Sequence, residues 1–416
     1  MRAPAFLACV LVGCSDPGGG GSQEGESSTA AASTSSTTTT LSTSGSSSSG
    51  AIDESSSTGV EEPPRPAYEE WLKVELPETV CGNGTQYKFF VNYYEGSKDL
   101  MVLFEPGGGC WDFDSCSGRE GVLGAANPDG IPDDHMEGQI GKHTPLLLRY
   151  LDTNPVRDWN MVFMPYCTGD VHTGNSVATY VDPLGEEPDL EFHHAGHANV
   201  QAAIGWMQEQ FPVIPRMYVV GCSAGGAGSL ANYYFLRSQL NAERGYLLDD
   251  SGPIFPNSTN SKPLHDQIRM SWDIDSILEM VPEFSELGED FGLINEMLAD
   301  TFPDDRLATT FFRRDYNFSR YSYERFFPGI TEDEIHEKWW EDTQQLVAQY
   351  DTRDNLGYFI PYWRYPNDSH CTIILTWEGT EIQEAGDIDV GDYMQMLLDD
   401  TQPMPSFLES EQPGEG

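Results

Sequence analysis

Residues 216–230 constrain the fold more than any other stretch of the chain. An apolar, β-branched run at 217–220 stops at the sequence Gly-Cys-Ser-Ala-Gly (221–225), and an Ala-, Leu- and Tyr-rich stretch follows it. This order of strand, G-x-S-x-G and helix is that of a nucleophile elbow, where small residues let the chain turn tightly and expose a serine hydroxyl. The motif alone also occurs in Gly/Ser-rich loops, but its strand and helix context favours a catalytic Ser223.

Composition divides the chain into segments. Residues 15–66 consist largely of Ser, Thr, Gly and Glu and contain almost no large apolar side chain. Such a segment buries too little surface to offset its chain entropy, so we expect a disordered linker at 14–66. Aromatic and aliphatic residues return at Tyr68, and we expect one folded domain at 67–405 and a disordered tail at 406–416.

The first 14 residues have the features of an export signal. One basic residue, Arg2, precedes a short apolar stretch that ends in Leu-Val-Gly-Cys at 11–14. The stretch is too short to span a bilayer, and it resembles the signal of bacterial lipoproteins, which implies a cleaved segment 1–13 and a lipidated Cys14. A plain signal peptide is the alternative. Ser15 resembles the residue found in lipoproteins sorted to the outer membrane, so we expect a lipid-anchored outer-membrane or extracellular protein.

The formal net charge of −45 limits the possible partners. It argues against nucleic acid and anionic lipid as ligands, because both are polyanions. Six cysteines follow the export segment, and an even number in an exported chain favours disulfides. None of them forms a C-x-x-C pair, so a zinc site has little support, and we expect neither a metal nor a cofactor. We expect the protein to be a monomer.

Short apolar runs alternate with helical patterns along the folded part. This alternation predicts an α/β fold with a mostly parallel central sheet flanked by helices on both faces. An acidic, largely helical segment at 264–345 is expected to form an insertion over the sheet edge. The expected strands cover residues 71–76, 86–94, 100–104, 159–164, 217–220, 246–248 and 372–377, and the expected helices cover 196–210 and 224–240.

A glycine run provides candidates for the oxyanion hole. Three glycines at 107–109 directly follow the expected strand 100–104. In α/β-hydrolases one oxyanion donor comes from such a loop and the other is the amide after the nucleophile. We therefore expect the amides of Gly108, Gly109 and Ala224 to bind the oxyanion; a purely structural turn is the alternative for the glycines.

The catalytic base should follow the nucleophile in the chain, because the order in this fold is serine, acid, histidine. Three histidines do so: His265, His336 and His370. His336 lies in a charged helical pattern and is expected at the solvated surface, and His265 is too close behind the elbow. His370 lies in a polar loop before the last apolar run, so we expect it to be the base.

Five motifs together resemble those of the pectin acetylesterase/Notum family, over residues 75–380. They are Glu-Pro-Gly-Gly-Gly-Cys-Trp (105–111), Tyr-Cys-Thr-Gly-Asp-Val-His-Thr-Gly (166–174), Gly-Cys-Ser-Ala-Gly-Gly (221–226), Asp-Ser-Gly (250–252) and Ser-His-Cys (369–371). The resemblance implies an α/β-hydrolase-like fold, a Ser-Asp-His triad and carboxylesterase activity on O-acetylated polysaccharide or fatty-acylated protein. Trp111 is displaced by one residue from the family pattern, which leaves open which amide completes the oxyanion hole.

We expect Asp315 to be the acid of the triad. It interrupts an aromatic-rich stretch that would restrict water around the carboxylate, and its position resembles that of the family's acid. Asp250 is the competing candidate because it ends an expected strand at the carboxyl edge of the sheet, although it can cap its own turn. A surface ion pair with Arg313 or Arg314 is the alternative for Asp315.

Adjacency to the triad predicts one disulfide. Because Cys222 neighbours Ser223 and Cys371 neighbours His370, we expect these two cysteines to be bonded. Cys110 with Cys116, and Cys81 with Cys167, are the remaining candidate pairs. The three histidines within 193–197 suggest a metal cluster, but their spacing lacks a zincin pattern, and we expect packing beside the elbow instead.

The combined expectation is an exported, lipid-anchored serine carboxylesterase that removes O-acetyl groups from extracellular polysaccharide. A neutral glycan is favoured, because pectin and this chain are both strongly anionic. A deacylase for longer acyl chains on protein or lipid is one alternative. A surface-binding lipoprotein without activity is another, because a fold does not guarantee function.

Overall fold

The computed structural model describes residues 68–119, 124–137, 144–256 and 260–410. The expected export segment 1–13, Cys14, the linker 14–66 and the last six residues of the expected tail lie outside the described residues. No helix in the described ranges is both long enough and apolar enough to cross a membrane.

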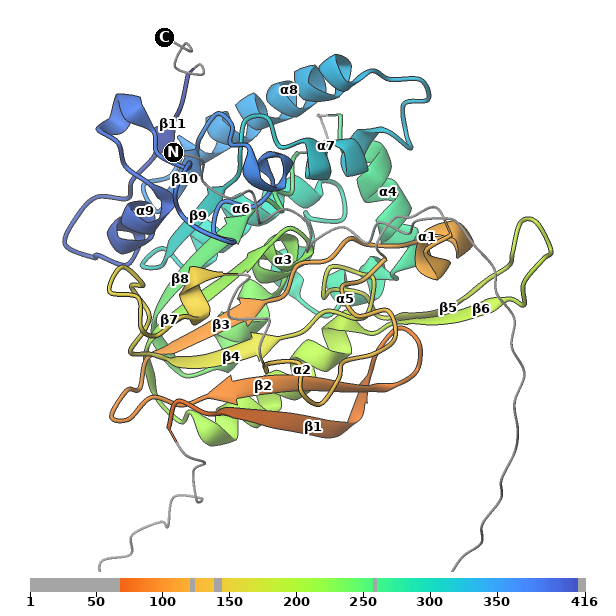
Figure 1. The fold of residues 1–416 in the computed structure, drawn as a ribbon, viewed down its shortest axis with the longest axis horizontal. Helices are drawn as coiled ribbons and strands as arrows, with labels where there is room; N and C mark the ends of the chain where they lie inside the picture. The colour runs from red at the N-terminus through yellow and green to blue at the C-terminus, as the bar shows by residue number, and fades with distance from the viewer. Residues whose placement is uncertain (1–67, 120–123, 138–143, 257–259, 411–416) are drawn as a thin grey trace, which may run out of the picture. The chain divides into compact units, whose positions relative to one another are not determined.

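A nine-stranded sheet runs through the described part of the chain, in the order β1-β2-β4-β3-β7-β8-β9-β10-β11 (Figure 1). β1 pairs antiparallel with β2, and β2 with β4, whereas all pairs from β4 to β11 are parallel. The mostly parallel sheet predicted from the sequence is therefore confirmed. The strands are β1 (Trp71–Val80), β2 (Gln86–Asn92), β3 (Leu100–Phe104), β4 (Asn160–Met164), β7 (Ile214–Cys222), β8 (Ala242–Asp250), β9 (Arg306–Thr310), β10 (Leu356–Ile360) and β11 (Phe407–Leu408).

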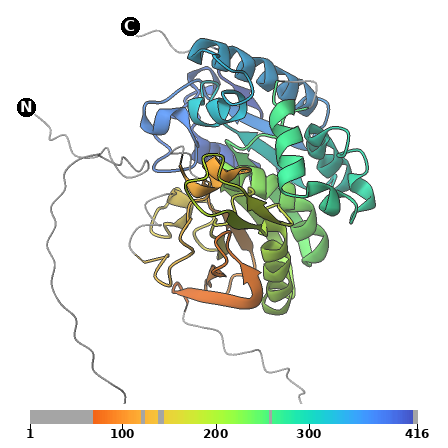
Figure 2. The ribbon, with the colours of Figure 1, turned by 90° about the vertical axis from the view of Figure 1, so that its right-hand side faces the viewer.

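The core follows from the composition of the central strands. Every residue of β3 and β4 is buried, as their continuous apolar sequences require of strands covered on both faces. Helices α2 (Gly196–Gln210), α3 (Ala224–Gln239), α6 (Ile294–Thr301) and α8 (Glu332–Tyr350) contact one another in series, and α2 and α3 lie to one side of the strands in Figure 2. The other α-helices of the described residues are α1 (Phe113–Ser117), α4 (Lys262–Ser271), α5 (Ile274–Leu278), α7 (Tyr316–Tyr323) and α9 (Val390–Leu397).

The segment 264–345 is not only a helical insertion, which corrects the sequence prediction. It contains helices α4 to α8, but it also returns to the sheet as β9, between β8 and β10. The sequence of β9, Arg-Leu-Ala-Thr-Thr, has too few large apolar residues to indicate a buried strand. Its Arg306 is buried because the guanidinium donates to main-chain carbonyls, among them that of Leu397 at 2.8 Å.

Residues 372–377 do not form the expected last strand. They make a series of bends, because their backbone groups bind side chains instead of a neighbouring strand. The domain also continues past residue 405, since β11 pairs with β10 and the amide of Glu409 donates to the carbonyl of Ile360. Residues 406–410 thus belong to the folded part rather than to a tail. A hairpin of β5 (Ser176–Tyr180) and β6 (Leu190–His194), which the sequence did not predict, extends from the body at the right of Figure 1.

Candidate active site

The elbow has the geometry that its sequence predicts. Ser223 stands between β7 and α3 with φ 56° and ψ −122°, a positive-φ conformation that is unusual for a residue other than glycine. Its amide donates to the carbonyl of Asp250 at 2.7 Å. A Cβ at Gly221 would lie 2.3 Å from the carbonyl oxygen of Gly225, and a Cβ at Gly225 would lie 2.2 Å from that of Phe104. The two glycines are therefore steric requirements of this turn.

His370 and Asp315, which are 55 residues apart in the chain, are hydrogen-bonded. The Nδ1–H of His370 donates to Oδ2 of Asp315 at 2.8 Å, and the Asp315 side chain is fully buried. Asp315 precedes α7 as its N-cap, and its Oδ1 accepts from the amide of Phe318 at 3.0 Å. Each oxygen of the Asp315 carboxylate therefore has its own partner: Oδ1 caps helix α7, and Oδ2 orients the imidazole of His370.

The charge of Asp315 governs the proton affinity of His370. Burial alone would lower the pKa of His370, but the Asp315 carboxylate stabilises the protonated ring by charge and by its hydrogen bond. The net effect raises the pKa of His370 above its ordinary value.

The carboxylates of Asp250 and Asp315, the two candidates for the triad acid, have different hydrogen-bond partners. Asp250 is also fully buried, but its carboxylate accepts from the backbone amides of Thr372 and Ile373 rather than from an imidazole. The surface ion pair that was the alternative for Asp315 does not form among the described residues. The guanidinium of Arg313 lies 3.8 Å from the ring centre of Trp340 instead.

A disulfide joins the elbow to the loop that carries His370. Cys222 and Cys371 are bonded, with Cα atoms 5.7 Å apart. A ring nitrogen of His370 lies within 4.8 Å of both sulfur atoms. The immediate neighbours of Ser223 and His370 are therefore covalently linked, as expected from the sequence. Cys81–Cys167 and Cys110–Cys116 are also bonded.

The glycines at 107–109, which we call the oxyanion loop, are held from outside by two tyrosines. The hydroxyl of Tyr166 donates to the carbonyl of Gly108 at 3.0 Å, and that of Tyr321 donates to the carbonyl of Gly109. Because the C=O and N–H of a trans peptide point in opposite directions, the Tyr166 contact turns the Gly109 amide to the other side of the loop. The amide of Cys110 is occupied, since it donates to the carbonyl of Gly169 at 2.8 Å.

The displacement of Trp111 left open which backbone amides are available to an oxyanion. With the Cys110 amide engaged, the amides of Gly108 and Gly109 are left without a backbone acceptor in the described part of the chain, as is that of Ala224 at the start of α3. Trp111 packs away from the main core, in a buried cluster with Trp272 and Leu264.

His172, His194 and His197 pack in the interior before the elbow, whereas His193 is partly exposed beside Glu191. His172 donates from Nε2 to the carbonyl of Glu105 at 3.0 Å, and burial lowers its pKa to about 4. His194 contacts the carbonyl of Thr168 and the hydroxyl of Tyr180, and His197 lies against the ring of Phe235. The packing expected beside the elbow is what the structure shows for His194 and His197.

Two clusters of described residues are compact enough to hold a metal ion: Cys110, Cys116 and His194, and Cys222, Cys371 and His370. Each contains one disulfide, so its sulfur atoms are bonded to each other rather than available as thiolates. Neither donor set therefore matches a metal centre while these bonds are intact.

The two histidines rejected as the base are both buried. For His336 this corrects the expected solvated position: only 8% of it is exposed, its ring packs 5.6 Å from that of Tyr316, and burial lowers its pKa. The helix α8 that carries it packs against α7, which the charged sequence around it did not indicate. His265 is buried in α4.

Three residues around the site were missed by sequence reasoning. Tyr166 lies in one of the five family motifs, and that position was the only signal for its contact with the oxyanion loop. Tyr321, which holds the same loop, and Arg364, which binds the segment after His370, had no signal in the sequence.

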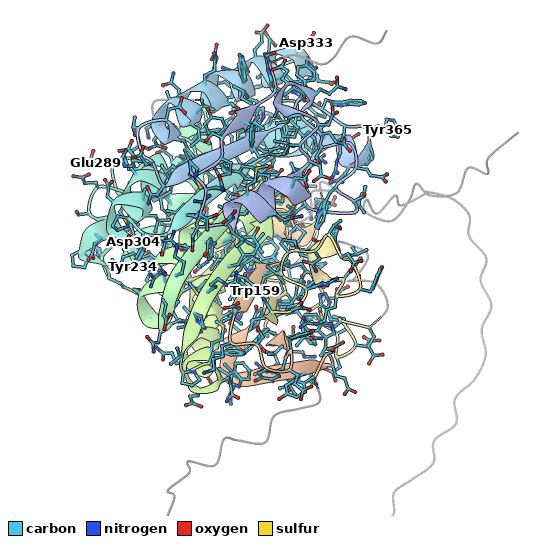
Figure 3. The ribbon with its side chains drawn as sticks, turned by 90° about the vertical axis from the view of Figure 1, so that its left-hand side faces the viewer. Trp159, Tyr234, Glu289, Asp304, Asp333 and Tyr365 are labelled. Carbon is cyan, nitrogen blue, oxygen red and sulfur yellow. A yellow bond between two sulfur atoms is a disulfide. The ribbon has the colours of Figure 1, made fainter. Side chains whose placement is uncertain are left out.

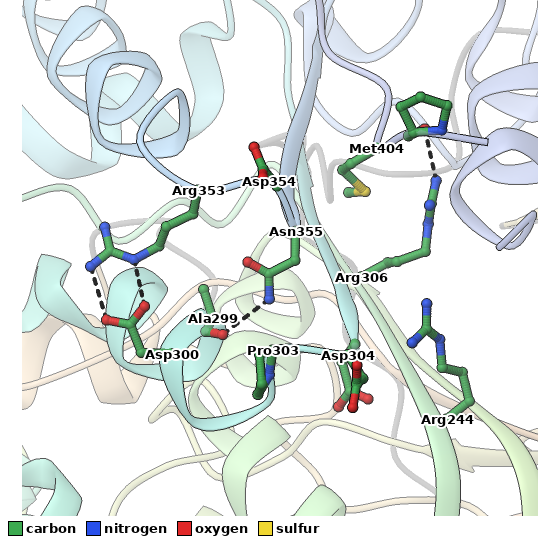
Figure 4. A pocket seen from close by; sticks show the side chains of 12 residues that line it. Arg244, Ala299, Asp300, Pro303, Asp304, Arg306, Arg353, Asp354, Asn355 and Met404 are labelled. Atoms are coloured by element: carbon green, nitrogen blue, oxygen red, sulfur yellow. Dashed lines mark hydrogen bonds and ion pairs between the residues drawn. The ribbon is translucent and has the colours of Figure 1, made fainter. Parts of the chain in front are cut away.

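The structure also contains a pocket of about 540 Å³ (Figure 4). It is lined by residues at the amino ends of β9 and β10, whereas Ser223 and Asp250 lie at carboxyl ends of strands. Its arginines already have partners: Arg353 pairs with Asp300, Arg244 pairs with Asp400, and Arg306 donates to carbonyls of the C-terminal segment. None of the candidate catalytic residues lines this pocket.

Comparison with known proteins places these features in context. Residues 71–273 match the pectinacetylesterase family. Palmitoleoyl-protein carboxylesterase notum1a of Danio rerio is 26% identical over 194 residues, which cover 44% of this chain and 36% of that protein. Pectin acetylesterase 4 of Arabidopsis thaliana is 24% identical over 222 residues, which cover 47% of this chain and 48% of that protein. The matches thus span less than half of these relatives' own length.

A solved structure extends the comparison to the fold. The structure of the Wnt deacylase Notum from Drosophila superposes with a TM-score of 0.55 at 19% identity, covering 81% of this chain and 95% of that chain. At this identity the likeness concerns the fold, and it confirms the predicted α/β-hydrolase-like architecture.

Proposed function

We propose that this chain, a relative of the pectin acetylesterase/Notum family, is a serine carboxylesterase with Ser223, His370 and Asp315 as its triad. The observation that carries the proposal is the 2.8 Å hydrogen bond from His370 to a fully buried Asp315, on a loop covalently tied to the elbow. A nucleophile, an oriented base and a buried acid in this chain order are the parts of a serine esterase.

In the proposed reaction the Oγ of Ser223 attacks the ester carbonyl while Nε2 of His370 accepts the hydroxyl proton. Asp315 holds the opposite ring nitrogen and stabilises the imidazolium. The oxyanion receives hydrogen bonds from the amide of Ala224 and from those of Gly108 and Gly109, each contributing about 3 kcal/mol to transition-state stabilisation. His370 then protonates the leaving alkoxide. Water, deprotonated by the same histidine, releases the carboxylic acid from Ser223.

For the substrate we propose O-acetyl groups on a neutral extracellular polysaccharide. A formal net charge of −45 disfavours a polyanionic chain such as pectin. Two exposed aromatic side chains precede His370 in its loop: Trp363 is 42% exposed and Tyr365 81%, with ring centres 6.5 Å apart. Tyr365 projects from the surface in Figure 3. Exposed aromatic faces beside a polar site suit the apolar faces of uncharged sugar rings.

The alternative substrate is a longer acyl chain on protein or lipid. It is supported by the relatives, among which are a palmitoleoyl-protein carboxylesterase and a Wnt deacylase. A panel of acetylated polysaccharides and of p-nitrophenyl esters of increasing chain length separates the two. We expect the highest kcat/KM with acetyl esters; an optimum at long chains would replace the deacetylase by the deacylase.

Active-site labelling tests whether the protein is an enzyme at all. A fluorophosphonate probe should attach to Ser223, as located by peptide mass spectrometry, and Ser223→Ala should abolish both labelling and ester hydrolysis. Failure of the folded wild-type protein to react would overturn the proposal in favour of a surface-binding protein without activity.

Export to an oxidising compartment is part of the same proposal, and the three disulfides support it. Lipidation of Cys14 remains a prediction from the sequence. Metabolic labelling with palmitate should mark the wild-type protein in a bacterial host but not Cys14→Ser. Equal labelling of the two would exclude the anchor.

A further inference from the structure

The segment around His370 is held in a strained conformation. Residues 367–376, which we call the base loop, contain five residues other than glycine with positive φ: Asn367 (57°), Asp368 (48°), Ser369 (56°), Cys371 (63°) and Leu375 (66°). Each such residue costs roughly 1–3 kcal/mol, so the conformation persists only where surrounding groups impose it. The groups that impose it therefore determine where the His370 ring stands.

The amides of the base loop are bound by Asp250 and its neighbour. Oδ1 of Asp250 accepts from the amide of Thr372 at 2.9 Å, and Oδ2 accepts from that of Ile373 at 3.0 Å. The hydroxyl of Ser251 accepts from the amide of Cys371 at 3.0 Å and donates to Asp250 at 2.9 Å. Three consecutive amides after His370 are thus fixed to the end of β8.

The carbonyls of the base loop are bound by Arg364. Its guanidinium donates to the carbonyl oxygens of Cys371, Ile374 (3.2 Å) and Thr376 (2.8 Å). Arg364 is only 3% exposed. Burial lowers its pKa to about 10, so the guanidinium keeps its charge near neutral pH. Burial raises the pKa of the Asp250 carboxyl, and the hydrogen bonds from the Ile373 and Thr372 amides oppose that shift by stabilising the carboxylate. A buried carboxyl group and a buried guanidinium therefore bind opposite groups of one backbone segment, which compensates the cost of burying each of them.

We propose that Asp250 and Arg364 are positioning residues for His370, one holding the amides and the other the carbonyls of the base loop. The inference rests on the proposed function, because it assigns a purpose to the placement of a catalytic base. Asp250 also holds the nucleophile, since its main-chain carbonyl accepts from the Ser223 amide at 2.7 Å. One residue thereby connects the backbones of both reacting side chains. Neither positioning side chain makes the Asp315 contact itself.

The charges of Asp250 and Arg364 should change the pH dependence of activity in a way that loss of packing alone would not. After Asp315, the largest charge effects on His370 come from the carboxylate of Asp250, which raises the pKa of His370, and from the guanidinium of Arg364, which lowers it. Activity needs neutral His370, so kcat/KM rises as pH passes the pKa of this ring. Removing the Asp250 charge should move this acid limb to lower pH, and removing the Arg364 charge should move it to higher pH.

The test compares Asp250→Asn, Arg364→Gln and the double variant. Each single variant should lower kcat by about 10²-fold, the typical cost of misplacing a catalytic group by about 1 Å, with little change in KM. The acid limb should shift in opposite directions in the two single variants and return toward the wild-type position in the double variant. Arg364→Lys, which keeps the charge but loses the forked donor, should lower kcat without moving the limb.

Asp342→Asn provides the matched control. Asp342 is fully buried and binds two successive amides, those of Asn260 (2.8 Å) and Ser261 (3.1 Å), as Asp250 does, but it is not among the largest charge effects on His370. Its loss should reduce stability without moving the acid limb. If folded Asp250→Asn and Arg364→Gln keep kcat within threefold of wild type, or if the acid limb of each stays at the wild-type pH as in the control, the proposal is wrong.

A second readout does not depend on esterase activity. The proton of the His370–Asp315 hydrogen bond should give a downfield signal in the NMR spectrum, absent from His370→Gln. We expect this signal in wild type and in Asp342→Asn, and we expect its loss or displacement in Asp250→Asn and Arg364→Gln. An unchanged signal in both of these variants would refute the positioning role, even if one of them had lost activity. A wild-type protein with this signal but without hydrolysis or labelling would instead refute the proposed function.

Discussion

Replacing Asp315 by Asn tests the assignment of the triad most directly, because the structure dictates how the new amide must lie. Oδ1 of Asp315 caps α7 by accepting from the Phe318 amide, and Oδ2 faces His370. An asparagine that keeps the cap therefore places its Nδ2 donor against Nδ1 of His370. The ring must then accept at Nδ1 and carry its proton on Nε2. In that tautomer it cannot take the proton of Ser223.

The expected magnitude follows from that tautomer. Loss of the correct tautomer in a triad lowers kcat by about 10⁴-fold, or about 5.5 kcal/mol of transition-state stabilisation. Stability should change little, since Asn caps helices about as well as Asp. The pKa of His370 should fall, because the Asp315 charge that raises it is gone. The residual activity should therefore extend to lower pH than that of wild type, in which the raised pKa of His370 should place the acid limb at higher pH than an ordinary histidine would.

The assay is steady-state hydrolysis of p-nitrophenyl acetate across pH, with thermal unfolding of each variant. Asp389→Asn is the control: Asp389 caps α9 by accepting from the Asp392 amide at 2.8 Å, and it has no contact with the triad in the described residues. It should retain wild-type kcat. A folded Asp315→Asn with kcat within tenfold of wild type would refute the assignment of the acid.

Four further substitutions test the remaining parts of the proposed site. Tyr166→Phe removes the hydroxyl that orients the oxyanion loop, and kcat for p-nitrophenyl acetate should fall by roughly tenfold at unchanged KM; an unchanged kcat would show that the loop needs no such support. Trp363→Ala and Tyr365→Ala should raise KM for acetylated polysaccharide severalfold but leave KM for p-nitrophenyl acetate unchanged. Replacing Tyr150, which is 77% exposed, should change neither KM value. Equal KM changes for both substrates would contradict a sugar-binding role. Trp272→Ala opens space beside the oxyanion loop, so kcat/KM for p-nitrophenyl butyrate should increase by roughly tenfold relative to that for p-nitrophenyl acetate. A constant ratio of the two kcat/KM values would show that this ring does not limit acyl length.

The parts of the fold that the sequence predicted are those in which local pattern and burial agree. Strand β3 before the oxyanion loop is a continuous apolar run, as are residues 217–220 of β7 before Ser223, and the elbow between strand and helix has a steric signature of its own. The chain order of the fold then reduced the candidate bases to three histidines. The proximity of His370 and Asp315 agrees with that reasoning, and their catalytic roles remain predictions.

The errors arise where long-range contacts override the local pattern. β9 is polar in sequence, yet it lies in the sheet because carbonyls from the C-terminal segment satisfy its Arg306. Residues 372–377 are apolar, yet they form no strand because Asp250 and Arg364 bind their backbone. His336 looked solvated because its helix is charged, but α7 covers it. In each case the residues that decide the structure are distant in the sequence, so a pattern of neighbouring residues could not have indicated them.

The disulfide between Cys222 and Cys371 has a consequence for how this chain responds to proteolysis. It closes a loop of 149 residues, and such closure removes denatured-state entropy worth about 5 kcal/mol. Helices α4 to α8 lie entirely within that loop. A protease that cuts between them leaves two polypeptides that remain covalently joined where the nucleophile strand meets the base loop. Such a nicked molecule would migrate as one species until it is reduced, and the covalent link would keep the two halves of the site at high effective concentration.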